Sequence, residues 1–261
     1  MAFAAIGLLV YLIFRKKPMV KIPAKQVIIL LGIGLVVEAH WIAFFHAIKI
    51  SNISVTLGII SSGALFASVL EPLFFRKRID WLEVFIGIFI ILGLYIIFSY
   101  ELEYLTGIIV AIVATVLATV FTILNKKYTT RYPPTLISFY EMLGGFIGIT
   151  AYLLFSGSFN IEFIRPTTMD FVYLLILGLI CTAFAFAVSV DVMKELSAYT
   201  VMLSINMEPI YGIILAFVIF GESEHMTGGF YLGTAMILAS VFLYPMLKKR
   251  RGRRVNRLLD R

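Results

Sequence analysis

The chain has 261 residues, of which 61% are hydrophobic and only 14% are charged. A soluble domain of this length cannot bury so much apolar surface, so the composition excludes a soluble globular protein and indicates one whose solvent is lipid. The single cysteine excludes an intrachain disulfide and a cysteine-rich metal site. The net charge of +7 comes from basic residues beside hydrophobic segments, which indicates orientation in a membrane and not nucleic-acid binding.

Hydrophobic segments follow one another along the whole chain. They cover residues 2–14, 26–49, 54–75, 82–99, 105–125, 135–155, 170–193, 198–220 and 228–247. Most of them reach the length of about 20 residues that crosses a bilayer as a helix. The connections between them are short. We therefore predict an all-α membrane protein, a polytopic helical bundle of nine hydrophobic segments without a soluble domain.

The basic residues fall on alternate loops between these segments. When the carboxyl terminus is placed in the cytoplasm, the cytoplasmic side receives 20 of the 22 Lys and Arg residues, and only Lys49 and Arg165 lie outside. This distribution satisfies the positive-inside rule, and the opposite orientation would invert it. We therefore predict a multi-pass protein of the cell (inner) membrane with a cytoplasmic carboxyl terminus.

Residues 27–98 and 173–244 look like one hydrophobic unit written twice. A shift of 146 positions, without a gap, aligns these identical residues: Leu31/Leu177, Gly32/Gly178, Ala39/Ala185, Ser51/Ser197, Val55/Val201, Leu57/Leu203, Phe74/Phe220 and Gly87/Gly233. In the predicted topology the two copies cross the membrane in opposite directions, and Arg76–Arg78 aligns with Glu222–Glu224. Such inverted repeats are typical of secondary transporters, whose substrate site lies between the halves.

The duplication divides the chain into a first, truncated repeat at 1–99, a second repeat at 104–247 and a basic cytoplasmic tail at 248–261. Because Met1 aligns with Ile147, residues 104–146 have no counterpart in the first repeat. The segment 2–14 is also too short to span comfortably. We therefore expect that the chain lacks its first transmembrane helix and part of the second, through a misassigned start codon or a truncation.

Several short motifs carry a resemblance to a known family. They are Ala39-His40-Trp41, the run from Ala47 to Ser54, Leu70-Glu71-Pro72, Met207-Glu208-Pro209 and Phe220-Gly221-Glu222. The chain resembles, over essentially its whole length, the EamA-type branch of the drug/metabolite transporter superfamily. The resemblance implies a ten-helix bundle of two inverted halves that exports or exchanges small polar metabolites. It also implies that helices 26–49, 54–75, 105–125, 170–193 and 198–220 line a central cavity.

Polar residues inside the predicted spans are candidate site residues, because an ionisable side chain at membrane depth is costly and is retained for a reason. Glu38 and Glu208 lie near the middle of spans from different halves, and other polar or aromatic side chains fall at similar depth or on the same helix face. We predict substrate binding or proton coupling at Glu38, Trp41, Phe45, Ser61, Ser62, Thr182, Asn206 and Glu208.

Each acidic residue also has a structural interpretation. Glu208 with Pro209 could form a helix break, in which the protonated acid bonds to freed backbone groups, and Glu38 could be an interhelical hydrogen-bonding group. Glu141 and Asp191 lie nearer the cytoplasmic end of their spans, where we expect gate residues or anchors that reach toward the headgroups. We expect Glu71 to pair with Arg76 or Lys77.

Secondary transport of a small polar metabolite by alternating access, an amino acid or related compound moved outward, accounts best for these features. A non-transporting membrane subunit or sensor is an alternative, as is an intramembrane enzyme, although the chain has no H-E-x-x-H motif and no Gly-rich nucleotide loop. We expect no metal and no cofactor. The expected partners are the substrate, protons and lipid. The motifs Gly144-x-x-x-Gly148 and Gly229-x-x-x-Gly233 serve helix contacts and are compatible with a homodimer.

Overall fold

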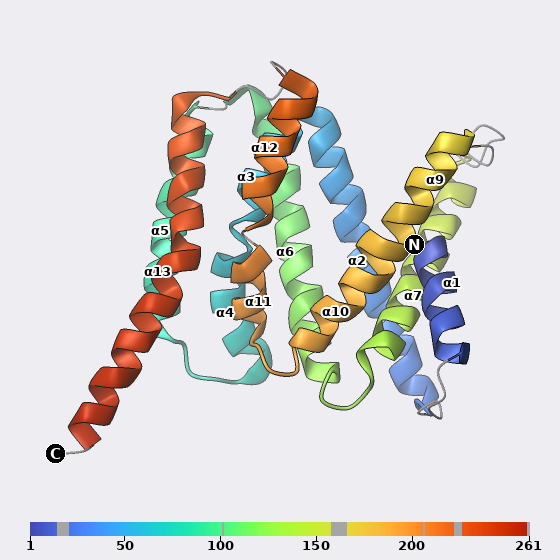
Figure 1. The fold of residues 1–261 in the computed structure, drawn as a ribbon, viewed down its shortest axis with the longest axis horizontal. Helices are drawn as coiled ribbons and strands as arrows, with labels where there is room; N and C mark the ends of the chain where they lie inside the picture. Colours follow the sequence, from blue (N-terminus) through green and yellow to red (C-terminus); the bar gives the residue numbers. More distant parts are fainter. Residues whose placement is uncertain (15–20, 101, 158–165, 206, 222–225, 260–261) are drawn as a thin grey trace. The chain divides into compact units, whose positions relative to one another are not determined.

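The computed structural model describes residues 1–14, 21–100, 102–157, 166–205, 207–221 and 226–259. All regular structure within these residues is helical (Figure 1). The helices are α1 (Ala2–Phe14), α2 (Ala24–Ile50), α3 (Ile53–Ile60), α4 (Gly63–Phe75), α5 (Trp81–Tyr100), the short 3-10 helix η1 (Leu102–Tyr104), α6 (Leu105–Tyr128), α7 (Pro134–Phe155), α9 (Thr168–Ile176), the π-helical segment η2 (Leu177–Phe184), α10 (Ala185–Val192), α11 (Ala198–Ile205), α12 (Glu208–Phe220) and α13 (Gly228–Leu259).

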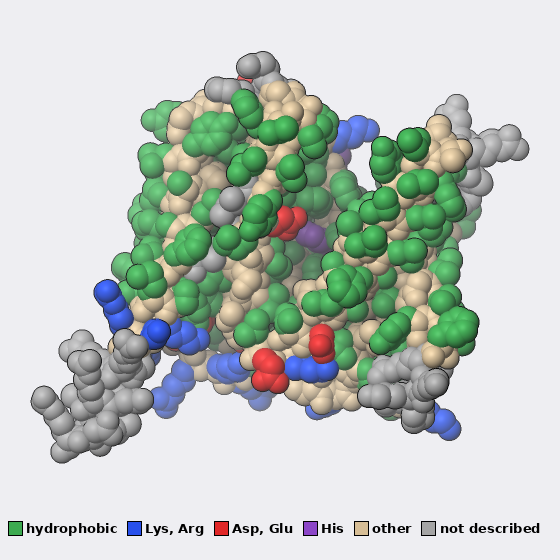
Figure 2. Space-filling view, viewed as in Figure 1, with side chains coloured by type: hydrophobic (Ala, Val, Ile, Leu, Met, Phe, Trp, Pro, Cys, Tyr) green, Lys and Arg blue, Asp and Glu red, His purple; other side chains and the backbone are tan. Residues whose placement is uncertain are grey.

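The predicted hydrophobic segments are all helical within the described residues. Six spans are long and apolar enough to cross a membrane: Ala24–Ile50, Ile53–Phe75, Leu102–Tyr128, Pro134–Phe155, Thr168–Val192 and Gly228–Arg251. Shorter apolar helices accompany them. Hydrophobic side chains cover most of the helix surface that Figure 2 shows, which suits contact with lipid. The prediction of an all-α, polytopic membrane protein is confirmed.

The chain forms two compact units, one of residues 1–39 and 124–197, the other of residues 40–123 and 198–261. In the first unit, α1 packs against α7 and η2, and α7 packs against α10. Close approach of α2 and α7 depends on glycine: a Cβ on Gly34 would overlap the backbone of Glu141, and a Cβ on Gly144 would overlap the backbone of Leu31. Backbones this close leave no room for side chains, as is usual between transmembrane helices.

In the second unit, α5 and α13 lie side by side (Figure 1). A Cβ on Gly93 would come within 2.7 Å of the carbonyl oxygen of Gly233, and a Cβ on Gly233 within 2.5 Å of that of Gly93. The other glycine of the motif, Gly229, lies against the ring of Tyr100. The Gly229-x-x-x-Gly233 motif therefore packs α13 onto α5 within the chain, while a homodimer stays a prediction.

Two spans of the second unit are each broken into two helices. The pieces α3 and α11 are eight residues long, and the pieces α4 and α12 are thirteen. Each boundary of α11 and α12 lies 145 residues after its counterpart in α3 and α4, one residue short of the 146-residue register. The piece α3 packs against α12, and α4 packs against α11. Breaks at matching positions support the predicted duplication.

In both broken spans, a side-chain oxygen accepts a hydrogen bond from the first turn of the first helix. The Asn52 side chain accepts a hydrogen bond of 2.8 Å from the Val55 backbone N–H at the start of α3. At the matching position, Ser197 directly precedes α11, whose first residue is Ala198. Here the carboxylate of Glu71, on α4, accepts a bond of 2.8 Å from the Tyr199 backbone N–H. A side chain from the neighbouring helix thus accepts a hydrogen bond from the first turn of α11.

Glu71 also pairs with a lysine at the end of its own helix. Its second carboxylate oxygen lies 3.1 Å from Lys77 Nζ, which confirms the pairing expected from the sequence. The two oxygens of Glu71 therefore serve two different partners, a helix N-terminus and a cation.

Candidate functional site

Ser61 and Ser62 lie at the break between α3 and α4, and both are wholly buried. The Ser61 hydroxyl donates to the carbonyl of Leu57 at 3.1 Å, and the Ser62 hydroxyl donates to the carbonyl of Ile59 at 2.7 Å. Both hydroxyls therefore bond to carbonyl groups of the turn that precedes them, a local role that serine often takes in apolar helices. The start of α4 is covered as well, because a Cβ on Gly63 would overlap the Met202 methyl group of α11.

The second break is more open. Glu208 is the first residue of α12, follows the N-cap residue Met207, and has an exposed side chain. A carboxylate in the first turn is stabilised by the helix dipole, and proline is well tolerated at the position that follows. A new helix therefore begins at Glu208–Pro209, while the expected bonding of a protonated Glu208 to freed backbone groups stays a prediction. The predicted site residue Asn206 lies outside the described residues.

Each break leaves backbone groups without helical partners inside an apolar span. The first N–H groups of α4 and α12 and the last carbonyl groups of α3 and α11 cannot all bond within their own helices. Of the two half-helix N-termini, that of α12 carries an exposed acid, whereas that of α4 is covered by Met202. The start of α12 is therefore the candidate substrate contact in the second unit.

Glu38, Trp41 and Phe45 lie on one continuous helix, α2, at a spacing that puts them on one face. Their exposure rises along that face: Glu38 is 9% exposed, Trp41 is half-buried, and Phe45 is 55% exposed. Glu38 belongs to the first unit, and Glu208 to the second. The aromatic side chains beside Glu38 could contact the apolar part of a small ligand.

Thr182 lies in the π-helical segment η2, which interrupts the span from α9 to α10. Its hydroxyl donates to the carbonyl of Leu177, five residues earlier, at 2.7 Å. The aligned part of α2 is regular α-helix, so the two repeats differ here. π-Helical turns occur frequently at functional sites, because they displace side chains from their regular positions. The helix α1 packs on this segment, where a Cβ on Gly178 would approach Phe3 and one on Gly7 would approach Leu179.

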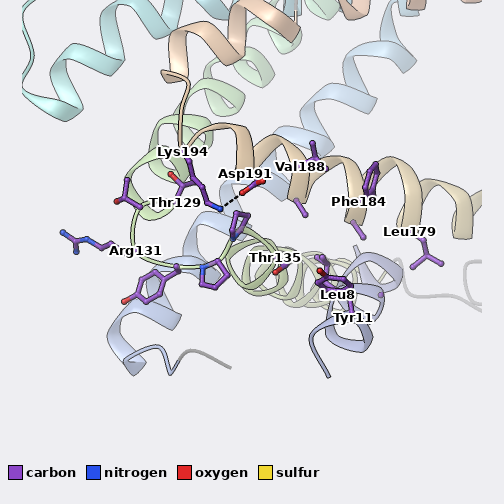
Figure 3. A pocket seen from close by; sticks show the side chains of 17 residues that line it. Leu8, Tyr11, Thr129, Arg131, Thr135, Leu179, Phe184, Val188, Asp191 and Lys194 are labelled. Atoms are coloured by element: carbon purple, nitrogen blue, oxygen red, sulfur yellow. Dashed lines mark hydrogen bonds and ion pairs between the residues drawn. The ribbon is translucent and has the colours of Figure 1, made fainter. Parts of the chain in front are cut away.

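A cavity of about 920 Å³ lies in the first unit between α1, the loop from α6 to α7, and η2 with α10 (Figure 3). Its polar lining includes the side chains of Thr135, Asp191 and Lys194. Figure 3 shows the ion pair between Asp191 and Lys194, whose nitrogen and oxygen lie 2.5 Å apart. The predicted gate residue Asp191 thus borders a cavity of the size that binds small molecules.

The other predicted gate residue, Glu141, is wholly buried on α7. Its carboxyl group accepts a hydrogen bond of 3.1 Å from the side-chain amide of Asn125, on α6. The expectation that Glu141 could be an anchor reaching toward the headgroups is wrong, because no part of it is exposed. Sequence reasoning missed Asn125, the last residue of the predicted segment 105–125, which directly precedes Lys126 and Lys127. Its zero exposure shows that it lies inside the unit.

Comparisons with known proteins bear on this arrangement. A family model described as "EamA-like transporter family" matches residues 105–245, more than half of the chain. Seven chains of solved structures match as well. One of them, titled only "Crystal structure of protein", is 16% identical with a TM-score of 0.67 and covers 94% of this chain and 84% of its own length. At that identity the likeness shows the fold alone. The comparison with curated proteins found no match.

Proposed function

Because this chain belongs to the EamA-like transporter family, a family of membrane transporters, we propose that it moves a small polar metabolite by alternating access. The proposed substrate is an amino acid or a related compound, and the proposed direction is export. The observation that carries the proposal is the pair of spans broken at matching positions, α3–α4 and α11–α12.

Unpaired backbone groups inside a bilayer cost several kcal/mol each, so broken spans are tolerated only where they are buried in protein or line a water-filled cavity. In transporters with inverted repeats, half-helix ends at the centre of the membrane contact the charged groups of the substrate. The break in α11–α12 follows eight residues of helix, or about 12 Å, which is near the middle of a span of about 30 Å.

The chemistry at the start of α12 favours a zwitterion. Backbone N–H groups there can receive a substrate carboxylate, and the exposed carboxylate of Glu208 can receive an ammonium group. A phosphate ester would call for an intramembrane Lys or Arg, and Lys49, Lys126 and Lys127 of the described spans lie at helix ends. An amino acid therefore fits better than a sugar phosphate.

Glu208→Gln tests this assignment. We expect the affinity for an amino-acid substrate to fall by roughly 1.5–3 kcal/mol, because the variant loses a hydrogen bond between charged groups. The measurement is counterflow in proteoliposomes of purified protein, with amino acids, purines, sugars and cationic drugs as candidate substrates. Glu38→Gln should impair transport too, by loss of substrate contact or of pH-driven flux, whereas Glu103→Gln, an exposed acid of η1, is the matched control.

Two outcomes contradict the proposal in different ways. Counterflow of no compound above that of protein-free liposomes would favour a non-transporting subunit or sensor. Transport by both Gln variants with unchanged affinity and unchanged pH dependence would remove Glu38 and Glu208 from the site while leaving the transport function in place.

The proposed topology has its own test. In Figure 2, Lys and Arg side chains gather at the end of the second unit where α4 is followed by α5. We expect this end to be cytoplasmic. With the exposed Cys181 replaced by Ser, cysteines at Lys77 and Ser223 should react with an impermeant maleimide from opposite sides of the membrane. Reaction of both from outside would contradict the inverted repeat.

A further inference from the structure

The buried acid of the first unit is only partly hydrogen-bonded. One carboxyl oxygen of Glu141 accepts from the amide nitrogen of Asn125, and the other has no hydrogen-bond partner. The amide oxygen of Asn125 and the hydroxyl of Ser138 are equally buried and equally without a partner. Glu141, Asn125 and Ser138 all have zero exposure. Buried polar atoms are almost always paired, so a cluster of unpaired oxygens calls for an explanation.

The cations near this cluster are occupied elsewhere. On α6, the ammonium group of Lys126 donates to the backbone carbonyls of Met193 and Lys194. On α10, the carboxylate of Asp191 is paired with Lys194. Among the described residues, no Lys or Arg forms an ion pair with Glu141.

The two other helices packed against α7 supply no counter-charge either. The helix α2 touches the backbone of Glu141 at Gly34. The ionisable residue one turn further along α2 is Glu38, which is itself an acid. On α1, the amino group of Met1 interacts electrostatically with Glu38. The one donor described for the Glu141 carboxyl is therefore the neutral amide of Asn125.

An ionised carboxylate cannot be accommodated by one neutral donor in such a place. Burying an unpaired charge costs far more than burying a neutral acid, so the group holds a proton instead. The protonated form also suits the neighbours, because a carboxylic acid offers one O–H donor to a cluster in which the amide oxygen of Asn125 and the hydroxyl of Ser138 are unpaired. Asn125 donates from its NH₂ group to Glu141, an arrangement that suits a carboxyl acceptor. It does not suit a metal cation shared by both side chains, because a cation would need the amide oxygen and not the NH₂ group.

A line of hydroxyl groups leads from the cavity to this acid. Thr135 lines the cavity, and Ser138 and Glu141 follow it on α7 at steps of three residues. Residues three apart are neighbours on a helix surface, with Cβ atoms about 5–6 Å apart. The hydroxyls of Thr135 and Ser138 both donate and accept hydrogen bonds, so each can pass a proton on. This spacing places Ser138 between the cavity-lining Thr135 and Glu141 along α7.

We propose that Glu141 is a proton-binding site, held by Asn125 and reached from the cavity through Thr135 and Ser138, and that its protonation couples transport to the proton gradient. The coupling rests on the proposed transport function, whereas proton binding at Glu141 does not. The residue expected from the sequence to be a gate thus becomes the residue that carries the proton.

Proton binding can be measured on the purified full-length protein without a substrate. We expect the infrared C=O stretching band of a protonated carboxylic acid to disappear as pH rises, and the part of that band assigned to Glu141 to be absent from Glu141→Gln. Glutamine keeps the shape of the protonated acid and its hydrogen bond to Asn125, so this variant should fold. Glu103→Gln, the control, should keep the part of the band assigned to Glu141.

A second variant keeps the test independent of the first. Asn125→Ala removes the one donor that favours the ionised form, so the band assigned to Glu141 should persist to higher pH.

Thermal unfolding is an independent test of proton binding at Glu141. The folded protein holds a proton that the unfolded chain releases, so the melting temperature should fall as pH rises, and Glu141→Gln should reduce that dependence. Ser138→Ala should slow proton uptake after a pH jump and leave the midpoint unchanged.

The outcomes separate the parts of the proposal. Identical carboxylic-acid bands in the wild type and Glu141→Gln would overturn proton binding, as would a stabilisation by sodium that Glu141→Gln removes. A Glu141 band together with unchanged pH-driven transport in Glu141→Gln would overturn coupling. Loss of pH-driven flux with retained counterflow in Glu141→Gln would support it. A Glu141 band in a protein that transports nothing would refute the proposed function and leave the proton site standing.

Discussion

Glu71→Ala should destabilise the protein by roughly 2–3 kcal/mol, the upper range for a hydrogen bond that involves a charged group. The carboxylate is 6% exposed and joins two helices, because it accepts from the Tyr199 backbone at the start of α11 and pairs with Lys77 beyond α4. Alanine removes the side-chain acceptor of the Tyr199 backbone N–H in an apolar environment. The measurement is thermal or denaturant-induced unfolding of the purified protein in detergent.

Two further variants separate the cap from the ion pair. Glu71→Gln keeps an oxygen that can accept from Tyr199 but removes the charge, so it should lose less than half as much stability as Glu71→Ala. Asp191→Asn breaks the exposed pair with Lys194 and should change stability by no more than about 1 kcal/mol. An equal loss in Glu71→Gln and Glu71→Ala would show that Lys77, and not the α11 cap, is the important partner.

Gly144→Ala should cost at least about 1–3 kcal/mol, the usual penalty for overpacking, because the added Cβ overlaps the Leu31 backbone and not a movable side chain. The helices α2 and α7 would have to separate. This separation would also break the backbone contact between Gly34 and Glu141. We expect a lower melting temperature and a smaller monodisperse fraction after extraction in detergent.

Gly32→Ala is the matched control on α2. A Cβ there meets nothing within 4 Å, so the substitution should be neutral or should stabilise the helix by up to about 1 kcal/mol. Gly148→Ala should be intermediate, because its Cβ would meet only the Leu35 side chain. Equal effects of the Gly32 and Gly144 substitutions would contradict the described contact between α2 and α7.

Hydrophobic length and loop charge were enough to predict the helical spans, because both are properties of the chain that lipid imposes on any fold. The breaks were harder to predict. Glu208-Pro209 is a recognisable helix start, but Ser61 and Ser62 carry no such signal, since serine is tolerated inside apolar helices by bonding to its own backbone. The π-helical turn around Thr182 has no sequence signal that we recognise.

Partners across the fold were the other limit on prediction. The pairing of Glu71 with Lys77 is local and was predicted, whereas its bond to Tyr199 joins positions 128 residues apart and needed the structure. The same holds for Glu141. Its position near the cytoplasmic end of its span suggested a gate, whereas its full burial and its hydrogen bond from Asn125 depend on how the helices pack. The helix α13 also continues to Leu259, past the predicted end at 247, because Lys and Arg are good helix formers.

The bond between Glu71 and the start of α11 has a mechanical consequence. Perfect inverted copies, related by a two-fold axis, would open toward the two sides of the membrane by equivalent movements of equal cost. Here Asn52 travels with α3 and keeps its bond wherever that helix goes, whereas α11 loses its bond to Glu71 as soon as it parts from α4. Separation of the α4–α11 pair therefore costs this buried, charge-assisted hydrogen bond. During the proposed transport cycle, the bond would hold α4 and α11 together until other contacts compensate for its loss.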